Sequence, residues 1–170
     1  MISELNVTIA LAVVTFVFLC SFWFAPGGVL ALRRRAGGEL QVDVRFSYAP
    51  ATLYRLLDAY GPAGRRSFRA MLLADMAFPA IYGMALYLLG DTLSSTSAHI
   101  GGLALVVRGA AISAAAFDYA ENFFLLHVLR HLELRSGKSA RFAAICTTAK
   151  MLAFAVAAIA LVSAWLSTRT

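Results

Sequence analysis

The sequence predicts an all-α membrane protein, a four-transmembrane-helix bundle with a short interfacial amphipathic helix between spans 1 and 2. Of its 170 residues, 61% are hydrophobic and only 14% are charged, whereas soluble domains carry about 25% charged residues. Four apolar stretches each reach the length of about 20 residues that crosses a bilayer. The connections between them are alternately rich in arginine and free of it, which is typical of a chain that crosses a membrane repeatedly.

The first span is predicted over residues 5–24. The short segment before it carries Glu4 and no lysine or arginine. We therefore interpret the stretch as a transmembrane helix and not as a secretory signal peptide, which needs a basic start. The helix is expected to end before Pro26, and three consecutive arginines follow at residues 33–35. They open a long cytoplasmic connection over residues 33–65.

Within this connection, residues 40–48 alternate between apolar and polar side chains, which predicts a half-buried strand. The sequence offers no second strand candidate, and an isolated strand leaves its backbone hydrogen bonds unmade. We therefore expect this segment to lie extended on the bundle, with pairing to a second copy of the chain as the alternative.

Residues 50–60 predict a short amphipathic helix. Pro50 stands in its first turn and Gly61 directly after its end, which are common start and stop residues. Leu53 and Leu57 belong to one apolar face. A helix of this kind is expected to rest in the plane of the membrane interface.

The remaining spans are predicted over residues 66–89, 101–129 and 141–166, so that a single membrane domain covers residues 1–170. Eight arginines lie between the first two spans and at the start of the second, and four basic residues lie between the last two. Because basic loops stay in the cytoplasm, both termini are expected on the non-cytoplasmic side of the cell inner membrane. The net charge of +6 is interpreted as attraction to membrane lipids, and nucleic acid is not an expected partner.

Four ionisable side chains lie inside these spans: Asp75 in the second, Asp118 and Glu121 in the third, and Lys150 in the fourth. A charge at the bilayer centre costs roughly 2.5–3.5 kcal/mol, so such residues normally face the bundle interior and pair with one another. Counted from the basic cytoplasmic edges of the spans, the four lie roughly 9–18 Å deep. We therefore expect them to form one cluster in the cytoplasmic half.

Helical spacing on the third span supports this cluster. Asp118, Glu121 and Asn122 are spaced i, i+3 and i+4 and so share one face. The same face continues in small residues, which let a neighbouring helix approach closely. These residues are Ala111, Ala114 and Ala115.

The second span carries a proline near its acidic residue. Pro79 cannot donate a hydrogen bond to the carbonyl of Asp75, four residues earlier, which predicts a kink there. Tyr82 is seven residues from Asp75, on the same face, so its hydroxyl is expected to join the network.

Two interpretations of the cluster stay open. In one it is a buried structural network, in which Lys150 neutralises Asp118 or Glu121. In the other it is a functional site in the bundle core. The candidates for catalysis are then Asp75, Asp118 and Glu121, and those for binding are Arg65, Arg66, Tyr82, Asn122 and Lys150.

Arg65 and Arg66 follow a glycine-containing turn at the start of the second span. Such a turn is a ready anion site, which suggests a lipid phosphate held above Asp75. The alternative is ordinary anchoring to lipid headgroups.

The sequence predicts no metal site and no cofactor. His127 is six residues from Glu121, off the acidic face, and no paired-histidine spacing is present. Cys20 and Cys146 are isolated residues in apolar spans, which is typical of buried small hydrophobic side chains.

Three motifs, GxxGRxxF, DxxFPxxY and FDxxEN, resemble those of an uncharacterised group of small bacterial four-helix integral membrane proteins. The resemblance covers less than half of the chain. It implies a bacterial inner membrane location and brings no known activity. The matching residues are Gly61, Gly64, Arg65 and Phe68, then Asp75, Phe78, Pro79 and Tyr82, then Phe117, Asp118, Glu121 and Asn122.

For the function we favour a non-catalytic membrane assembly or binding protein, alone, as a homodimer, or with a partner membrane protein. One alternative is a lipid-directed binding protein or enzyme that uses Asp75, Asp118 or Glu121 as acid or base. The other is a small proton- or cation-linked transporter, which needs a polar pathway from the cluster to the outer side near Arg108.

Overall fold

The computed structural model describes residues 2–96 and 101–167, and every regular element within these ranges is a helix. Four helical segments are long and apolar enough to cross a membrane. The predicted all-α fold with four helices able to span a membrane is therefore confirmed for the described residues. The elements are α1 (Ile2–Phe24), α2 (Val29–Arg35), η1 (Val42–Val44), α3 (Pro50–Asp75), α4 (Phe78–Thr96), α5 (Gly101–Arg130), η3 (Leu132–Leu134) and α6 (Gly137–Ser167).

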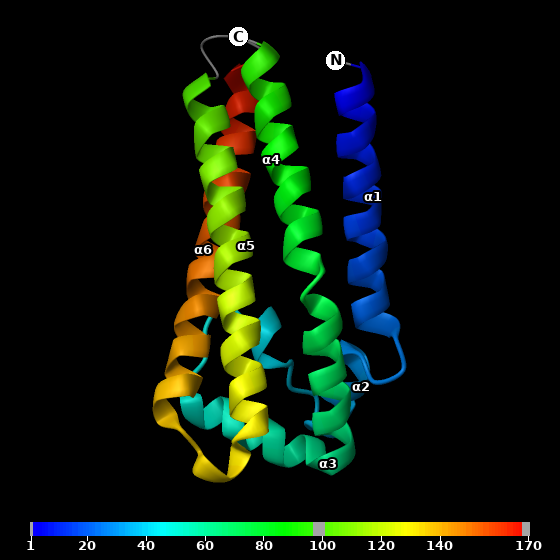
Figure 1. Ribbon diagram of the computed structural model, residues 1–170, viewed down its shortest axis with the longest axis vertical. Helices are drawn as coiled ribbons and strands as arrows, with labels where there is room; N and C mark the ends of the chain where they lie inside the picture. The colour runs from blue at the N-terminus through cyan, green and yellow to red at the C-terminus, as the bar shows by residue number, and fades with distance from the viewer. Residues whose placement is uncertain (1, 97–100, 168–170) are drawn as a thin grey trace.

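The bundle is built around α5, which packs along α6 on one side and α4 on the other, while α1 packs against α4 (Figure 1). The start of α1 and the end of α6 lie at the same end, as an even number of crossings requires. Small residues bring α4 and α5 together as predicted. A Cβ added to Gly83 would stand 3.2 Å from the Cβ of Ala115, and Ala111 and Ala114 are fully buried.

The helix predicted over residues 50–60 is present and turns away from the rest of α3 at Gly61. Gly61 has φ 62° and ψ −178°, a backbone conformation that essentially only glycine adopts. The turned segment crosses the base of the bundle (Figure 1). Its Leu57 is fully buried in a core that also contains Leu125 of α5 and Ala140 of α6. Its apolar face therefore packs on protein and closes the base.

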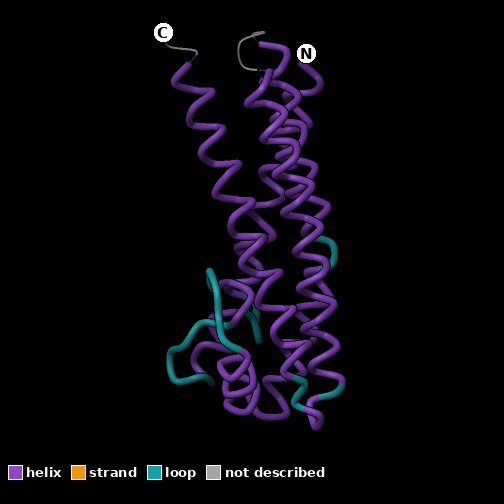
Figure 2. The backbone as a smooth tube through the Cα atoms, turned by 90° about the vertical axis from the view of Figure 1, so that its left-hand side faces the viewer, coloured by secondary structure: helices purple, strands orange, loops and turns teal. Residues whose placement is uncertain are grey.

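The strand predicted over residues 40–48 is wrong. The chain between α2 and α3 runs along the lower half of the bundle as a loop with one 3₁₀ turn, η1 (Figure 2). The Arg45 guanidinium donates to the carbonyl of Leu40 at 2.6 and 2.9 Å, which folds the segment back on itself. Among the described residues no neighbouring strand pairs with this backbone and holds it extended. The segment is instead held by its side chains, and Val42 is 1% exposed in the core.

The kink predicted near Pro79 is also present. Helix α3 ends at Asp75 and α4 begins at Phe78, so Met76 and Ala77 form a break within the second span. The break lies where Pro79, which has no N–H, cannot make the helical hydrogen bond to the carbonyl of Asp75. Asp75 is the last residue of α3 and therefore lies directly at this break.

Candidate functional site

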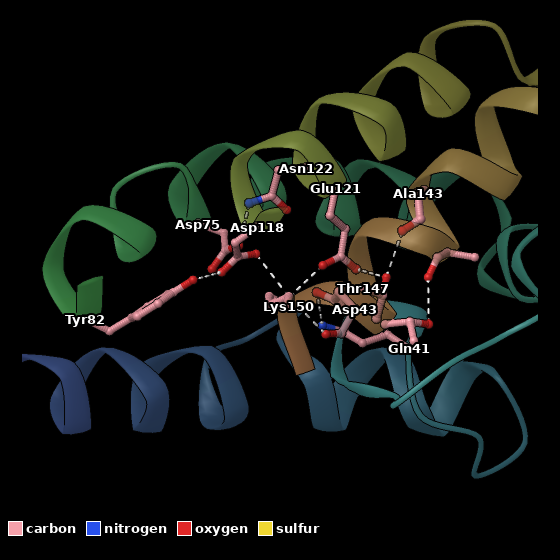
Figure 3. A network of polar contacts seen from close by, with 12 residues as sticks. Gln41, Asp43, Asp75, Tyr82, Asp118, Glu121, Asn122, Ala143, Thr147 and Lys150 are labelled. Carbon is pink, nitrogen blue, oxygen red and sulfur yellow. Dashed lines mark hydrogen bonds and ion pairs between the residues drawn. The ribbon is translucent and has the colours of Figure 1, made fainter. Parts of the chain in front are cut away.

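Lys150 of α6 stands at the centre of a polar network (Figure 3). Its Nζ lies 3.0 Å from Oδ1 of Asp118 and 2.6 Å from Oε2 of Glu121. It also donates to the main-chain carbonyl of Asp43 at 3.4 Å. All three charged side chains are buried, with Glu121 at 0% exposure. An ammonium group has three N–H donors, so Lys150 is fully engaged. The predicted pairing of Lys150 with the two acids of α5 is confirmed.

The remaining oxygens of these two acids are held by other helices. The Tyr82 hydroxyl of α4 donates to Oδ2 of Asp118 at 3.0 Å. The Thr147 hydroxyl of α6 lies 2.5 Å from Oε1 of Glu121. Every carboxylate oxygen of Asp118 and Glu121 therefore has a hydrogen-bond or ion-pair partner, and for Oε2 of Glu121 this partner is the ion pair with Lys150. The network ties α4, α5 and α6 together.

Asp75 lies at the break in the second span, at the edge of this network. The Asn122 amide of α5 donates to its Oδ2 at 2.6 Å. Asp75 is only partly buried. The predicted meeting of Asp75 with the acidic face of α5 is thus confirmed, through Asn122.

Two residues of the loop complete the network, and sequence reasoning missed both of them. Gln41 is 1% exposed, and its amide nitrogen donates to Oδ2 of Asp43 at 2.9 Å. Burial, together with the negative charge of Glu121, raises the pKa of Asp43 from 3.8 to about 7, although Lys150 opposes the shift. Both residues lie on the polar side of the alternating 40–48 pattern, and no sequence signal indicates that this side faces the bundle.

A cavity of about 350 Å³ borders the network between α1, the loop, the break in the second span, α5 and α6. One part of its wall is polar and another is aromatic. The polar residues are Gln41, Asp43, Asp75, Tyr82, Asp118 and Lys150. The aromatic residues are Phe22, Trp23, Phe78 and Phe154.

A second hollow of about 380 Å³ lies between α1 and α3. It shares Phe22 and Met71 with the cavity, and its other lining includes Ser67, Ala70 and Ala74 of α3. The two spaces are therefore neighbours, with the Phe22 and Met71 side chains between them.

The structure does not bring the two candidate arginines to the cavity. Arg65 donates to the carbonyl of Leu57 at 3.1 Å, which caps the helix at the base of the bundle, and Arg66 is exposed. Neither lines the cavity. Arg108, near the opposite end of α5, pairs with Asp91 at 3.0 Å.

The described residues contain no group of three or more histidine, cysteine, aspartate or glutamate side chains arranged to hold a metal ion. The ring of His127 lies beside that of His131, with ring centroids 4.7 Å apart and an angle of 45° between the ring planes.

No protein-family model, curated protein or solved structure matches this chain. The functional argument therefore depends on the chemistry of the cavity.

Proposed function

We propose that this chain is a multi-pass protein of a bacterial inner membrane that binds a small amphipathic ligand without transforming it. The observation that carries the proposal is the cavity beside the network, where carboxylates from Asp43, Asp75 and Asp118 face an aromatic wall. A pocket with an apolar body and a few converging polar groups is the usual form of a small-molecule site. Its volume of about 350 Å³ falls within the range of such sites.

The engagement of the buried acids supports binding over catalysis. Asp118 and Glu121 use all their oxygens on Lys150, Tyr82 and Thr147. A general acid or base must instead reach the proton that it transfers on the substrate. The two acids are thus engaged in holding the site together.

The position of α1 supports access from the side. Helix α1 packs against α4, and the hollow between α1 and α3 is separated from the cavity only by shared lining residues, among them Phe22 and Met71. A ligand that arrives through the membrane would then reach the acidic groups without crossing the α4–α5–α6 core.

The distribution of arginines supports an orientation with the base of the bundle in the cytoplasm and both termini outside. The basic residues of the two arginine-rich connections lie at the base, opposite the start of α1. The cavity would then open toward the cytoplasmic leaflet. The exposed arginines at the base would then bind the anionic headgroups of membrane lipids.

The transporter alternative has less support. It needs a polar pathway from Asp118 to the end of the bundle near Arg108. On α5 the buried residues between these two are Ala110, Ala111 and Ala114, which offer no polar group.

Tryptophan fluorescence tests the proposal, because Trp23 lines the cavity and Trp165 is distant from it near the end of α6. The Trp165→Phe variant, in phosphatidylcholine nanodiscs, would be titrated with dodecylamine, dodecanol and dodecanoate. We expect at least one of them to change the Trp23 emission saturably. The Thr15→Phe variant, which places a ring in the cavity, should abolish that change.

The matched control is Trp23→Phe, which keeps Trp165 as its reporter and should show only the unsaturable change caused by partition into lipid. Absence of a saturable signal with all three amphiphiles would overturn the proposal.

A further inference from the structure

We infer that the head group bound in the cavity is an organic ammonium, a cation that donates hydrogen bonds to the acids of the loop and of the second span. This inference rests on the proposed function and names the ligand class for the same site. Three independent features carry it: the charge of the wall, two buried oxygens without partners, and the aromatic lining.

The part of the cavity wall that the described residues form has acceptors but no free cation. Asp43, Asp75 and Asp118 line it, and the only basic residue among the lining residues is Lys150. Lys150 is already shared by Asp118, Glu121 and the carbonyl of Asp43. An anionic head group would therefore meet like charges with nothing to offset them, which opposes its binding.

Two residues that line the cavity each carry a buried oxygen without a hydrogen-bond partner among the described residues, namely Oε1 of Gln41 and Oδ1 of Asp43. The Gln41 amide is oriented by its nitrogen, which must face the Asp43 carboxylate as a donor. Its oxygen is thereby turned the other way. Buried polar atoms normally have partners, so these two oxygens call for a ligand with hydrogen-bond donors.

The aromatic part of the wall suits a cation with an apolar body. Tyr82 lies between two other rings, with centroid distances of 5.1 Å to Phe78 and 5.0 Å to Phe154. Trp23 and Phe22 of α1 line the cavity as well. Ring faces attract cations such as ammonium groups, and they also accept the apolar part of an amphiphile. A neutral alcohol would gain only the second of these contacts.

The test compares head groups on one chain length, using Trp23 fluorescence of the Trp165→Phe variant in uncharged phosphatidylcholine nanodiscs. At neutral pH dodecylamine is protonated, as a lysine side chain is. We expect it to bind at least about tenfold more tightly than dodecanol, which corresponds to 1.4 kcal/mol. Dodecanoate should show no saturable binding.

Two variants assign the effect to the acids. Asp43→Asn and Asp75→Asn should each weaken dodecylamine binding by about tenfold or more and leave dodecanol binding unchanged. Asp58→Asn is the matched control, because Asp58 is an exposed acid at the base that pairs with Arg135, and its dodecylamine affinity should equal that of the parent. Folding of each variant is checked by circular dichroism and thermal unfolding.

The outcomes separate the two proposals. Saturable binding of dodecanol or dodecanoate, without preference for dodecylamine, would overturn the ammonium assignment and leave the binding function standing. Unchanged dodecylamine affinity in both folded acid variants would also overturn the assignment. If none of the three amphiphiles binds, both proposals fail.

Discussion

The polar network has two ends that differ in how completely their atoms are paired. The closed end consists of Asp118, Glu121, Thr147 and Lys150, where each carboxylate oxygen and the ammonium group have partners. The open end consists of Gln41, Asp43 and Asp75, which border the cavity and include oxygens without partners. Both ends use the same side-chain chemistry.

The difference follows from the backbone that carries each end. The closed end lies on α5 and α6, two regular helices in contact along their length. The open end lies on a loop and on the last residue of α3, where the second span is interrupted. Regular helices fix side chains in register, so donors and acceptors match. We interpret the closed end as the structural part of the network and the open end as its binding part.

The largest effect is expected at the closed end, from Lys150→Met. The substitution keeps the length of the side chain but leaves the Asp118 and Glu121 carboxylates buried without a cation. Breaking a buried ion pair in this way destabilises by about 3–5 kcal/mol. The measurement is the free energy of unfolding in detergent. Lys138→Met is the control, since Lys138 is exposed at the start of the same helix, and a loss no larger than in this control would contradict a structural role.

A smaller effect is expected at the open end, from Asp43→Asn. This substitution should change how the stability of the protein depends on pH. The pKa of Asp43 is raised to about 7 in the folded protein from 3.8. The folded state therefore binds the proton more tightly, and unfolding becomes easier as pH rises between these two values. Between pH 5 and pH 8 the wild type should lose about 2–3 kcal/mol of its free energy of unfolding because Asp43 gives up its proton.

The variant cannot bind that proton, so its melting temperature should fall less than that of the wild type between pH 5 and pH 8. Its stability at pH 8 should match or exceed that of the wild type. Parallel pH curves for the two proteins would show that Asp43 keeps its ordinary pKa, and hence that the open end is not buried as described.

Much of the closed end could be predicted from the sequence because it depends on regular geometry. The spacing of Asp118, Glu121 and Asn122 places them on one helical face. The cost of burying the charge of Lys150 in a membrane then requires a partner, and Asp118 and Glu121 supply it. The break after Asp75 follows from the missing N–H of Pro79.

The open end could not be predicted in the same way. Residues 36–49 form a loop that is held by the hydrogen bonds of Arg45 to the Leu40 carbonyl and by the burial of Val42 in the core. The alternating pattern indicates neither of these contacts and predicted a strand. Helix α1 is apolar on all sides, and its sequence therefore does not indicate which face meets the cavity. The glycine-containing turn before Arg65 suggested an anion site as one of two interpretations, but the Arg65 side chain donates to the Leu57 carbonyl and does not line the cavity.

At the closed end, Thr147→Val should produce the next effect. The substitution keeps the shape of the side chain and removes the hydroxyl that lies 2.5 Å from Glu121 Oε1. A buried acceptor is left unpaired, which costs about 1–2 kcal/mol. The measurement is again the free energy of unfolding. Thr148→Val is the control, because among the described residues the Thr148 hydroxyl bonds to the Ala144 carbonyl of its own helix and to no acid. Equal losses in both variants would mean that the contact between Thr147 and Glu121 does not stabilise the folded protein.

The smallest change in stability is expected from Asp75→Asn, and this prediction separates the two ends most directly. The new amide can still accept the hydrogen bond that Asn122 gives to Asp75 at 2.6 Å. It can also donate to Oδ1 of Asn122, a buried oxygen without a partner among the described residues. The free energy of unfolding should therefore change by less than about 1 kcal/mol, or rise. A loss as large as that of Lys150→Met would show that Asp75 belongs to the structural part of the network, and the division between a closed and an open end would then fail.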